Sequence, residues 1–159
     1  QGGQGDITIG TTILDGIKKT VSESTEIIYS KDGSDVVPNL DNIAVVVIGE
    51  DPYTEFFGDK ENLDLSDDDI NLISDLKDKG FKVAVLLISG RPLNIADHIG
   101  QWNGFAAIWL PGTEGDGVSD VLFGDFSSTG RLSFPWPINT EEGSNADKDN
   151  MLFEIGYGL

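Results

Sequence analysis

Two short apolar runs constrain the fold more than any other feature of this sequence. IAVVVIG (43–49) and VAVLLI (83–88) are continuous, rich in β-branched residues and far shorter than a membrane span. Such runs are typical of parallel strands that are buried on both faces of a sheet. Between them, residues 66–79 carry apolar side chains at helical spacing, and Gly80 follows where the helix should end. This order predicts a parallel sheet flanked by helices.

The rest of the chain extends the same pattern. TTILDGIKKTV (11–21) predicts a helix, TEIIYS (25–30) a short strand, FAAIWLPG (105–112) a third buried strand and GVSDVLFG (117–124) a further helix. TEEGSNADKDN (140–150) is a polar segment and predicts a loop. We therefore expect an α/β fold with helices on both faces of a mainly parallel sheet.

The charge of the chain excludes several classes of partner. Its 159 residues include 10 basic and 28 acidic side chains, for a net charge of −18. Nucleic acids and anionic membranes need a basic surface, so neither is expected as a partner. The chain has no cysteine, which excludes both a disulfide scaffold and a thiol catalyst.

Neither a metal site nor a cofactor is expected. His98 is the single histidine and cannot form a histidine-rich site. The segment 145–156 has oxygen ligands at spacing that suggests an EF-hand, but Asn150 replaces the turn glycine and Gly156 replaces the bidentate glutamate. The acids at 67–69 fall in the first turn of the predicted helix, where they complement the helix dipole.

In parallel α/β sheets, ligands bind beyond the carboxyl ends of the strands. Three unusual segments follow predicted strands here: GEDPYTEFFGD (49–59), SGRPL (89–93) and PGTEGDG (111–117). The last lacks the GxGxxG spacing and a following lysine, and its acids would repel phosphate. A flavodoxin-like nucleotide or flavin binder therefore stays only as a weaker alternative.

The segment 49–59 combines carboxylates with aromatic rings. Sugars stack their C–H faces on rings and offer hydroxyls to carboxylates, and a carboxyl group near apolar rings has the raised pKa that a general acid needs. The alternative is a solvated acidic loop with one or two helix-capping residues. The residues concerned are Glu50, Asp51, Tyr53, Glu55, Phe56, Phe57 and Asp59.

Several longer motifs resemble the second domain, an α/β sandwich, of glycoside hydrolase family 3. They are QGDITIGTTILDGIKKTVS, GEDPYTEFFGD, LLISGRPL, AAIWLPGTEGDGVSDVLFGD, TGRLSFPWP and FEIGYGL, and they cover nearly the whole chain in the correct order. The resemblance is greatest to exo-acting β-D-glucan glucohydrolases and β-glucosidases. It implies a three-layer α/β/α sandwich as the single domain spanning residues 1–159.

The resemblance also implies residue roles. In the motif G-E-x-P-Y-x-E the final glutamate is the acid/base, which corresponds to Glu55. Tyr53, Phe56 and Phe57 are candidate walls of the substrate site, while Asp59 and Arg91 are candidates for supporting the loop, because arginine can pair a carboxylate bidentately. Glu50 and Asp51 have no assigned role. The implied substrate is a β-glucoside or β-glucan oligosaccharide, cleaved at its non-reducing end with no cofactor.

The chain departs from the family pattern in what it lacks. The family's aspartate nucleophile lies on a preceding (β/α)8 barrel, which is absent, as are a first strand and a Trp-bearing segment before Gln1. We expect a truncated domain that is inactive alone, with an exposed sheet edge that favours self-association. A free-standing, non-catalytic carbohydrate-binding or interaction module is the alternative. The family and the acidic composition suggest a periplasmic or extracellular location.

Overall fold

A computed structural model describes residue 5 and residues 7–38, 42–53, 55–139 and 150–158 of the chain. Its centre is a parallel sheet of three strands in the order β1-β2-β3, formed by β1 (Ile43–Gly49), β2 (Lys82–Ile88) and β3 (Gly104–Trp109). The β1–β2 register runs without a break from Ile43 opposite Lys82 to Gly49 opposite Ile88. The carboxyl ends of these two strands are therefore level with each other.

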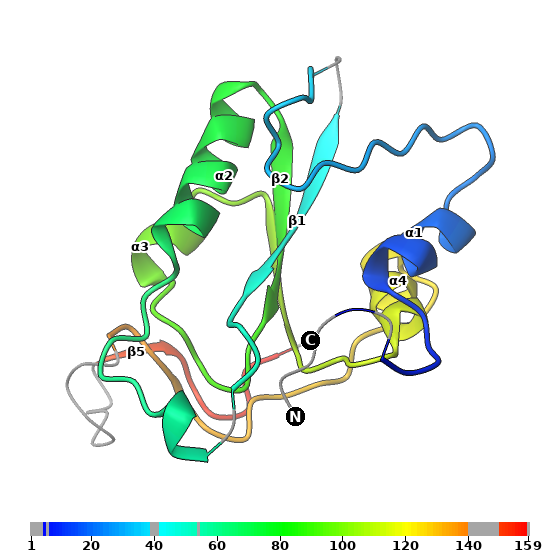
Figure 1. Cartoon of the computed structure of the whole chain (residues 1–159). Coiled ribbons are helices and arrows are strands. Elements are labelled where there is room, and N and C mark those ends of the chain that lie inside the picture. The colour runs from blue at the N-terminus through cyan, green and yellow to red at the C-terminus, as the bar shows by residue number, and fades with distance from the viewer. Residues whose placement is uncertain (1–4, 6, 39–41, 54, 140–149, 159) are drawn as a thin grey trace.

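Helices lie on both sides of this sheet (Figure 1). On one side are α2 (Asp67–Asp78) and the short α3 (Ala96–Ile99), and on the other are α1 (Ile13–Thr20) and α4 (Gly115–Phe123). The predicted start of α2 is confirmed: the Ser66 hydroxyl accepts a hydrogen bond from the Asp69 amide at 3.1 Å, which caps the helix. Helix α1 packs closely on α4 because Gly16 has no side chain; a Cβ there would lie 2.5 Å from the Gly115 carbonyl oxygen.

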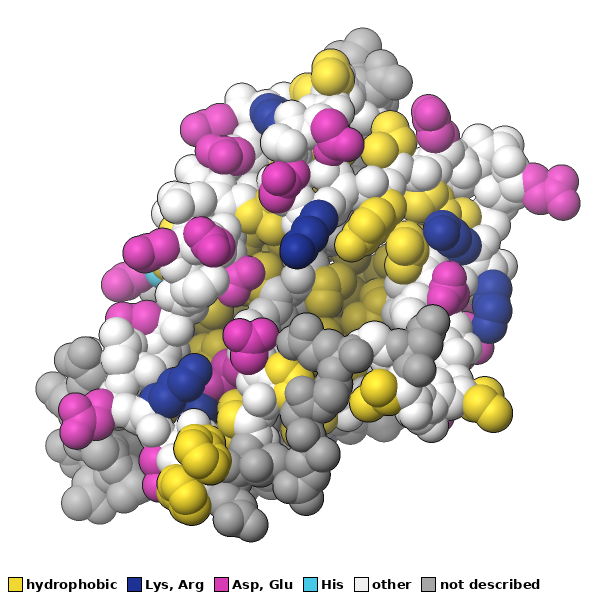
Figure 2. Space-filling view, in the orientation of Figure 1, with side chains coloured by type: hydrophobic (Ala, Val, Ile, Leu, Met, Phe, Trp, Pro, Cys, Tyr) yellow, Lys and Arg dark blue, Asp and Glu magenta, His cyan; other side chains and the backbone are white. Residues whose placement is uncertain are grey.

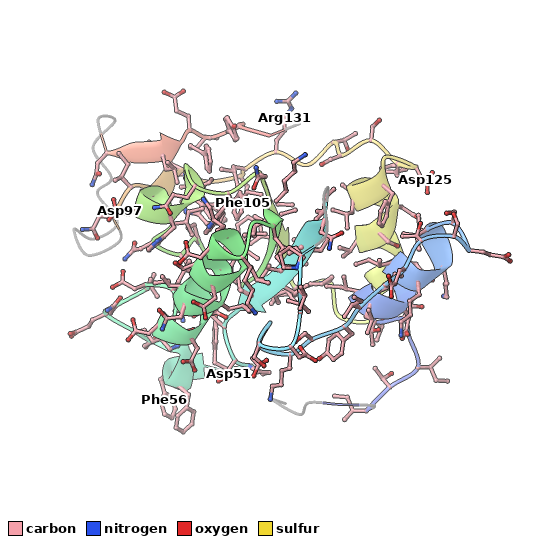
Figure 3. The ribbon with its side chains drawn as sticks, turned by 90° about the horizontal axis from the view of Figure 1, so that it is seen from above. Asp51, Phe56, Asp97, Phe105, Asp125 and Arg131 are labelled. Atoms are coloured by element: carbon pink, nitrogen blue, oxygen red, sulfur yellow. The ribbon has the colours of Figure 1, made fainter. Side chains whose placement is uncertain are left out.

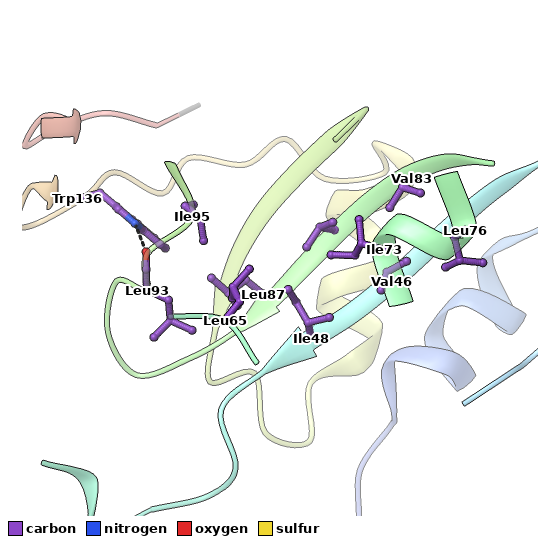
Figure 4. Close-up of a cluster of buried hydrophobic side chains, with 11 residues drawn as sticks. Val46, Ile48, Leu65, Ile73, Leu76, Val83, Leu87, Leu93, Ile95 and Trp136 are labelled. Atoms are coloured by element: carbon purple, nitrogen blue, oxygen red, sulfur yellow. Dashed lines mark hydrogen bonds between the residues drawn. The ribbon is translucent and has the colours of Figure 1, made fainter. Parts of the chain in front are cut away.

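The hydrophobic core fills the α2 side of the sheet (Figure 4). Val83, Val85 and Leu87 of β2 are fully buried there against Ile73 and Leu76 of α2. Alternate residues of one strand thus face one helix, as the pleat of a strand requires. The prediction of parallel strands flanked by helices is confirmed.

A second, two-stranded antiparallel sheet closes one end of this core. It consists of β4 (Trp136–Pro137) and β5 (Met151–Phe153). The Trp136 side chain is 1% exposed, and its indole Nε1 donates a 2.9 Å hydrogen bond to the Leu93 carbonyl (Figure 4). The sequence pattern does not predict these strands, because each is too short to show a period.

Two predictions about strands are wrong. Residues 25–30 form no strand, and Ile28 and Tyr29 are 61% and 67% exposed, because this segment pairs with no strand of the described sheet. Strand β1 is buried on one face only: Val46 and Ile48 face the core, while Ile43 and Val47 are 66% and 43% exposed. Figure 2 shows hydrophobic side chains gathered in the hollow between α2 and the α1–α4 pair.

The predicted polar loop at 140–150 lies outside the described residues except for Asn150. In the described part of the chain, no helix has both the length and the apolar character needed to cross a membrane.

Candidate active site

The first two candidate loops leave the sheet side by side. The Glu50 amide donates to the Ile88 carbonyl at 3.1 Å, directly after β1, and the Ser89 amide donates to the Trp109 carbonyl at 3.2 Å, directly after β2. Because parallel strands end at one edge, Glu50 and Arg91 start their loops next to each other. The structure thus brings together residues that are 41 positions apart in the sequence.

Arg91 forms a bidentate ion pair with Glu50. Its Nη2 donates to Glu50 Oε1 at 2.6 Å, and its Nε lies 3.2 and 3.3 Å from Glu50 Oε1 and Oε2. The Glu50 side chain is only 8% exposed and that of Arg91 22%. The hydrogen bond to Glu50 raises the pKa of Arg91 above its ordinary value. The guanidinium therefore keeps its positive charge.

The same guanidinium holds the loop that follows β1. Arg91 Nη1 donates to the Gly58 carbonyl at 2.6 Å, and the guanidinium carbon lies 4.6 Å from the centre of the Tyr53 ring. Tyr53 in turn contacts Gly58 so closely that a Cβ at residue 58 would lie 2.3 Å from the ring. Burial, and after it the charge of Glu50, raise the pKa of the Tyr53 hydroxyl, which therefore stays protonated.

Glu55 begins a single turn of 3₁₀ helix, η1 (Glu55–Gly58), which Arg91 contacts at its last residue. The Glu55 side chain lies outside the described part of the structure, so its role stays a prediction. Phe56 and Phe57 are 69% and 76% exposed, and their rings are 4.6 Å apart at an angle of 32°. Phe56 lies at the outer tip of the molecule (Figure 3), so these rings pack on nothing in the described core.

Asp59 and Lys60 directly follow the turn η1. Asp59 is exposed, and its amide donates to the Phe56 carbonyl at 3.1 Å. Its charge favours the protonated Arg91, but the hydrogen bonds of Arg91 go to Glu50 and Gly58. Lys60 Nζ lies 3.9 Å from Glu50 Oε1 and is half exposed. The carboxylate that Arg91 contacts is therefore Glu50 and not Asp59.

The third candidate loop joins a different cluster. Asp116 forms a 3.0 Å ion pair with Lys19 of α1 and accepts a hydrogen bond from the Thr11 hydroxyl at 3.1 Å. The hydrogen bond from Lys19 lowers the pKa of Asp116. The loop 111–117 thus ties α4 to α1, and none of these contacts involves Glu50, Tyr53 or Arg91.

The tip of the candidate site is exposed to solvent at Phe56, Phe57 and Asp59. Two surface hollows, of about 360 and 460 Å³, lie elsewhere and are lined by no described residue of the 49–59 loop. No group of three or more potential metal ligands occurs among the residues that the structure describes. The described side chains at this edge are carboxylates, aromatic rings, Arg91 and Lys60, which can make hydrogen bonds and stacking contacts with a neutral polar ligand.

Comparison with known proteins identifies the family. All residues, 1–159, match the glycosyl hydrolase family 3 C-terminal domain. This chain belongs to that family. The crystal structure of an exo-1,3/1,4-β-glucanase from a Pseudoalteromonas species is similar over 94% of the chain, with 37% identity and a TM-score of 0.82. A Listeria innocua β-glucosidase crystallised with laminaribiose has the same fold, with a TM-score of 0.74 at 19% identity.

Curated relatives agree with the family and differ in their named activities. A β-xylosidase from Formosa agariphila is 31% identical over 93% of the chain, and a periplasmic β-glucosidase from Salmonella typhimurium is 28% identical over 74%. The chain spans 25% and 19% of the lengths of these two proteins, and 20% of the exo-glucanase chain. The resemblance to family 3 seen in the sequence is thus confirmed.

Sequence reasoning assigns no role to Glu50, although a signal is present. Glu50 is the first residue after β1 and Arg91 is the third after β2, and adjacent parallel strands bring such positions together. An acid and an arginine at these two positions predict an ion pair across the edge of the sheet. The composition of the loop hides this signal, because Glu50 is one of several acids there.

Proposed function

We propose that this chain is the acid/base-bearing domain of a retaining, exo-acting β-glucosidase or β-glucan glucohydrolase. Family membership and the position of Glu55, at the start of an exposed helical turn beyond the carboxyl edge of the sheet, support the proposal. The similarity to an exo-1,3/1,4-β-glucanase at 37% identity supports the substrate class. The periplasmic relative supports a periplasmic or extracellular location.

In this mechanism Glu55 first donates its proton to the glycosidic oxygen as the sugar–oxygen bond breaks. An aspartate outside this chain, on a (β/α)8 barrel, attacks the anomeric carbon and forms a glycosyl-enzyme. Glu55, now a carboxylate, then removes a proton from the water that releases the sugar. The two carboxyl groups must lie about 5–5.5 Å apart in such a retaining enzyme.

The open surface around η1 agrees with a site that is shared with another domain. The exposed rings of Phe56 and Phe57 are available to contact a sugar or the partner domain. Because the nucleophile is elsewhere, the 159-residue chain alone does not hydrolyse β-glucosides.

The test replaces Glu55 by Gln in the complete enzyme and measures kcat/KM for β-glucosides and β-xylosides with leaving groups of different basicity. Loss of a general acid slows poor leaving groups most, typically by about 10²–10⁴-fold. An equal loss for every leaving group would contradict the proposal. Turnover of an aryl β-glucoside by the 159-residue chain itself, abolished by the same substitution, would contradict its inactivity alone.

The second candidate function is a non-catalytic carbohydrate-binding module. The exposed Phe56–Phe57 pair favours it, since exposed rings bind sugars without any acid. This function requires oligosaccharide affinity in the 159-residue chain that Glu55→Gln leaves unchanged and that Phe56→Ala weakens. Isothermal titration calorimetry with a β-glucan oligosaccharide measures both.

A further inference from the structure

We propose that Glu50 is a positioning residue for the acid/base, and that it acts through Arg91. The inference rests on the proposed role of Glu55. It assigns the support of the active-site loop to the Glu50–Arg91 pair rather than to Asp59.

Arg91 divides its hydrogen bonds between Glu50 and the turn η1. Its Nε and Nη2 face Glu50, while Nη1 donates to the carbonyl of Gly58, the last residue of η1. The planar guanidinium presents these donors in fixed directions. Glu50 therefore sets the direction in which Arg91 holds the turn that Glu55 begins.

The backbones of Glu50 and Arg91 are both fixed to the parallel sheet. Glu50 adjoins the last residue of β1, and its amide bonds to the end of β2. The buried hydroxyl of Ser89 donates to the carbonyl of Arg91 at 2.7 Å, which fixes the backbone of Arg91 as well. Both partners are thus anchored on adjacent strands, and the turn is tied to the sheet.

The Glu50–Arg91 ion pair is largely removed from solvent. Glu50 is 8% exposed, so the pair is not an ordinary surface salt bridge. A buried ion pair adds little stability compared with apolar residues of similar size, but removing one partner leaves a buried charge without compensation and is damaging. This location, between the sheet edge and η1, favours a positioning role over one in overall stability.

Asp59 provides the contrast within the same loop. It immediately follows η1 and is exposed, and the described hydrogen bond that it makes is through its backbone amide. Lys60 provides a second contrast, because it lies 3.9 Å from Glu50 but makes no described contact with η1. Replacing either residue changes a charge near the site without removing the link from Glu50 to Gly58.

The experiment compares Glu50→Gln and Arg91→Lys with the controls Asp59→Asn and Lys60→Gln, all in the complete enzyme. The readouts are kcat/KM and kcat for substrates with poor and good leaving groups. A displacement of the acid by about 1 Å costs on the order of 100-fold. We expect a loss of this size on poor leaving groups for both test variants, a much smaller loss on good ones, and near-normal rates for both controls.

The double variant Glu50→Gln/Arg91→Lys should lose no more activity than the worse single variant, because both changes disable one unit. Thermal unfolding of each variant shows whether a loss of activity comes from loss of the fold or from displacement of the acid/base in a folded enzyme. Arg91→Lys keeps a positive charge opposite Glu50 but removes the forked donors of the guanidinium. If Glu50→Gln does not fold, Arg91→Lys still tests the link from Glu50 to Gly58.

The proposal is overturned if the test variants lose activity equally on all leaving groups, or if Asp59→Asn is as damaging as Glu50→Gln. Glu55→Gln in the same series separates the two levels of inference. If it shows no leaving-group dependence, the proposed function fails. If Glu55→Gln shows a leaving-group dependence and Glu50→Gln shows none, only the positioning role of Glu50 fails.

Discussion

At the scale of single residues, the 49–59 loop depends on how closely the Arg91 guanidinium, the Tyr53 ring and the backbone of Gly58 can approach one another. The Arg91 guanidinium covers the Tyr53 ring at 4.6 Å, and the same ring leaves no space for a side chain at residue 58. The carbonyl of Gly58 is the atom that Arg91 holds. A glycine is needed there for close contact rather than for an unusual backbone angle.

Gly58→Ala should therefore destabilise the chain by about 1–3 kcal/mol, since overpacking forces the ring or the turn to move. Urea unfolding measures this free energy. Gly117→Ala is the matched control, because a Cβ at residue 117 meets nothing within 4 Å and lies within α4. The control should be neutral or slightly stabilising, and equal effects of the two substitutions would contradict the crowding argument.

At the scale of elements, α2 shows that acids in one helical turn are not equivalent. Asp67 is exposed, whereas Asp69 is half-buried. Burial raises the pKa of Asp69 above 3.8, and the hydrogen bond with Ser66 offsets this only in part. Burial, with repulsion from Asp68 and Asp51 added to it, thus outweighs the Ser66 hydrogen bond at Asp69, although both Asp67 and Asp69 lie in the first turn.

We expect Asp69→Asn to raise the melting temperature near neutral pH. A carboxyl group whose pKa is raised by folding stabilises the native state only while protonated, and this contribution is lost as the pH rises from 3.8 through the folded pKa. The gain from Asn should therefore vanish below about pH 3 and be largest near pH 7. Melting temperatures measured across this range test the expectation.

Asp67→Asn is the control for this pair. It removes an exposed charge that favours the helix dipole, so it should lower stability near neutral pH by about 0.3–1 kcal/mol. A gain from both substitutions would show that repulsion among the acids of α2, and not burial of Asp69, determines the effect.

At the scale of the whole molecule, the net charge of −18 is the dominant property. Repulsion among like charges destabilises a compact state. Salt weakens this repulsion, and at 0.1 M ionic strength exposed charges more than about 10 Å apart are largely screened from each other. Among the described residues, ion pairs join Lys19 to Asp116 and both Lys60 and Arg91 to Glu50. Ten basic side chains cannot neutralise 28 acidic ones, so repulsion among the acids remains.

The melting temperature of the chain should accordingly rise with sodium chloride near pH 7, most steeply below about 0.1 M, where screening changes most. Differential scanning calorimetry at several salt concentrations measures the slope. Near the isoelectric point of about 4.1 the net charge is small, so the same slope should shrink. A slope that does not depend on pH would contradict the charge explanation.

Local signals along the chain were enough to predict the three parallel strands, the helices α1, α2 and α4, and the family. These signals are continuous β-branched runs, helical spacing that ends at Gly80, and motifs preserved in order. They also placed Glu55, Tyr53 and Arg91 on loops at one edge of the sheet, because parallel strands end together.

The contacts across that edge came from the folded arrangement alone. The pairing of Glu50 with Arg91, the exposure of Phe56 and Phe57, and the attachment of the 111–117 loop to α1 all depend on groups distant in sequence. The same reason explains the two errors. Whether residues 25–30 pair, and whether the second face of β1 is covered, depends on neighbours that a local pattern does not contain.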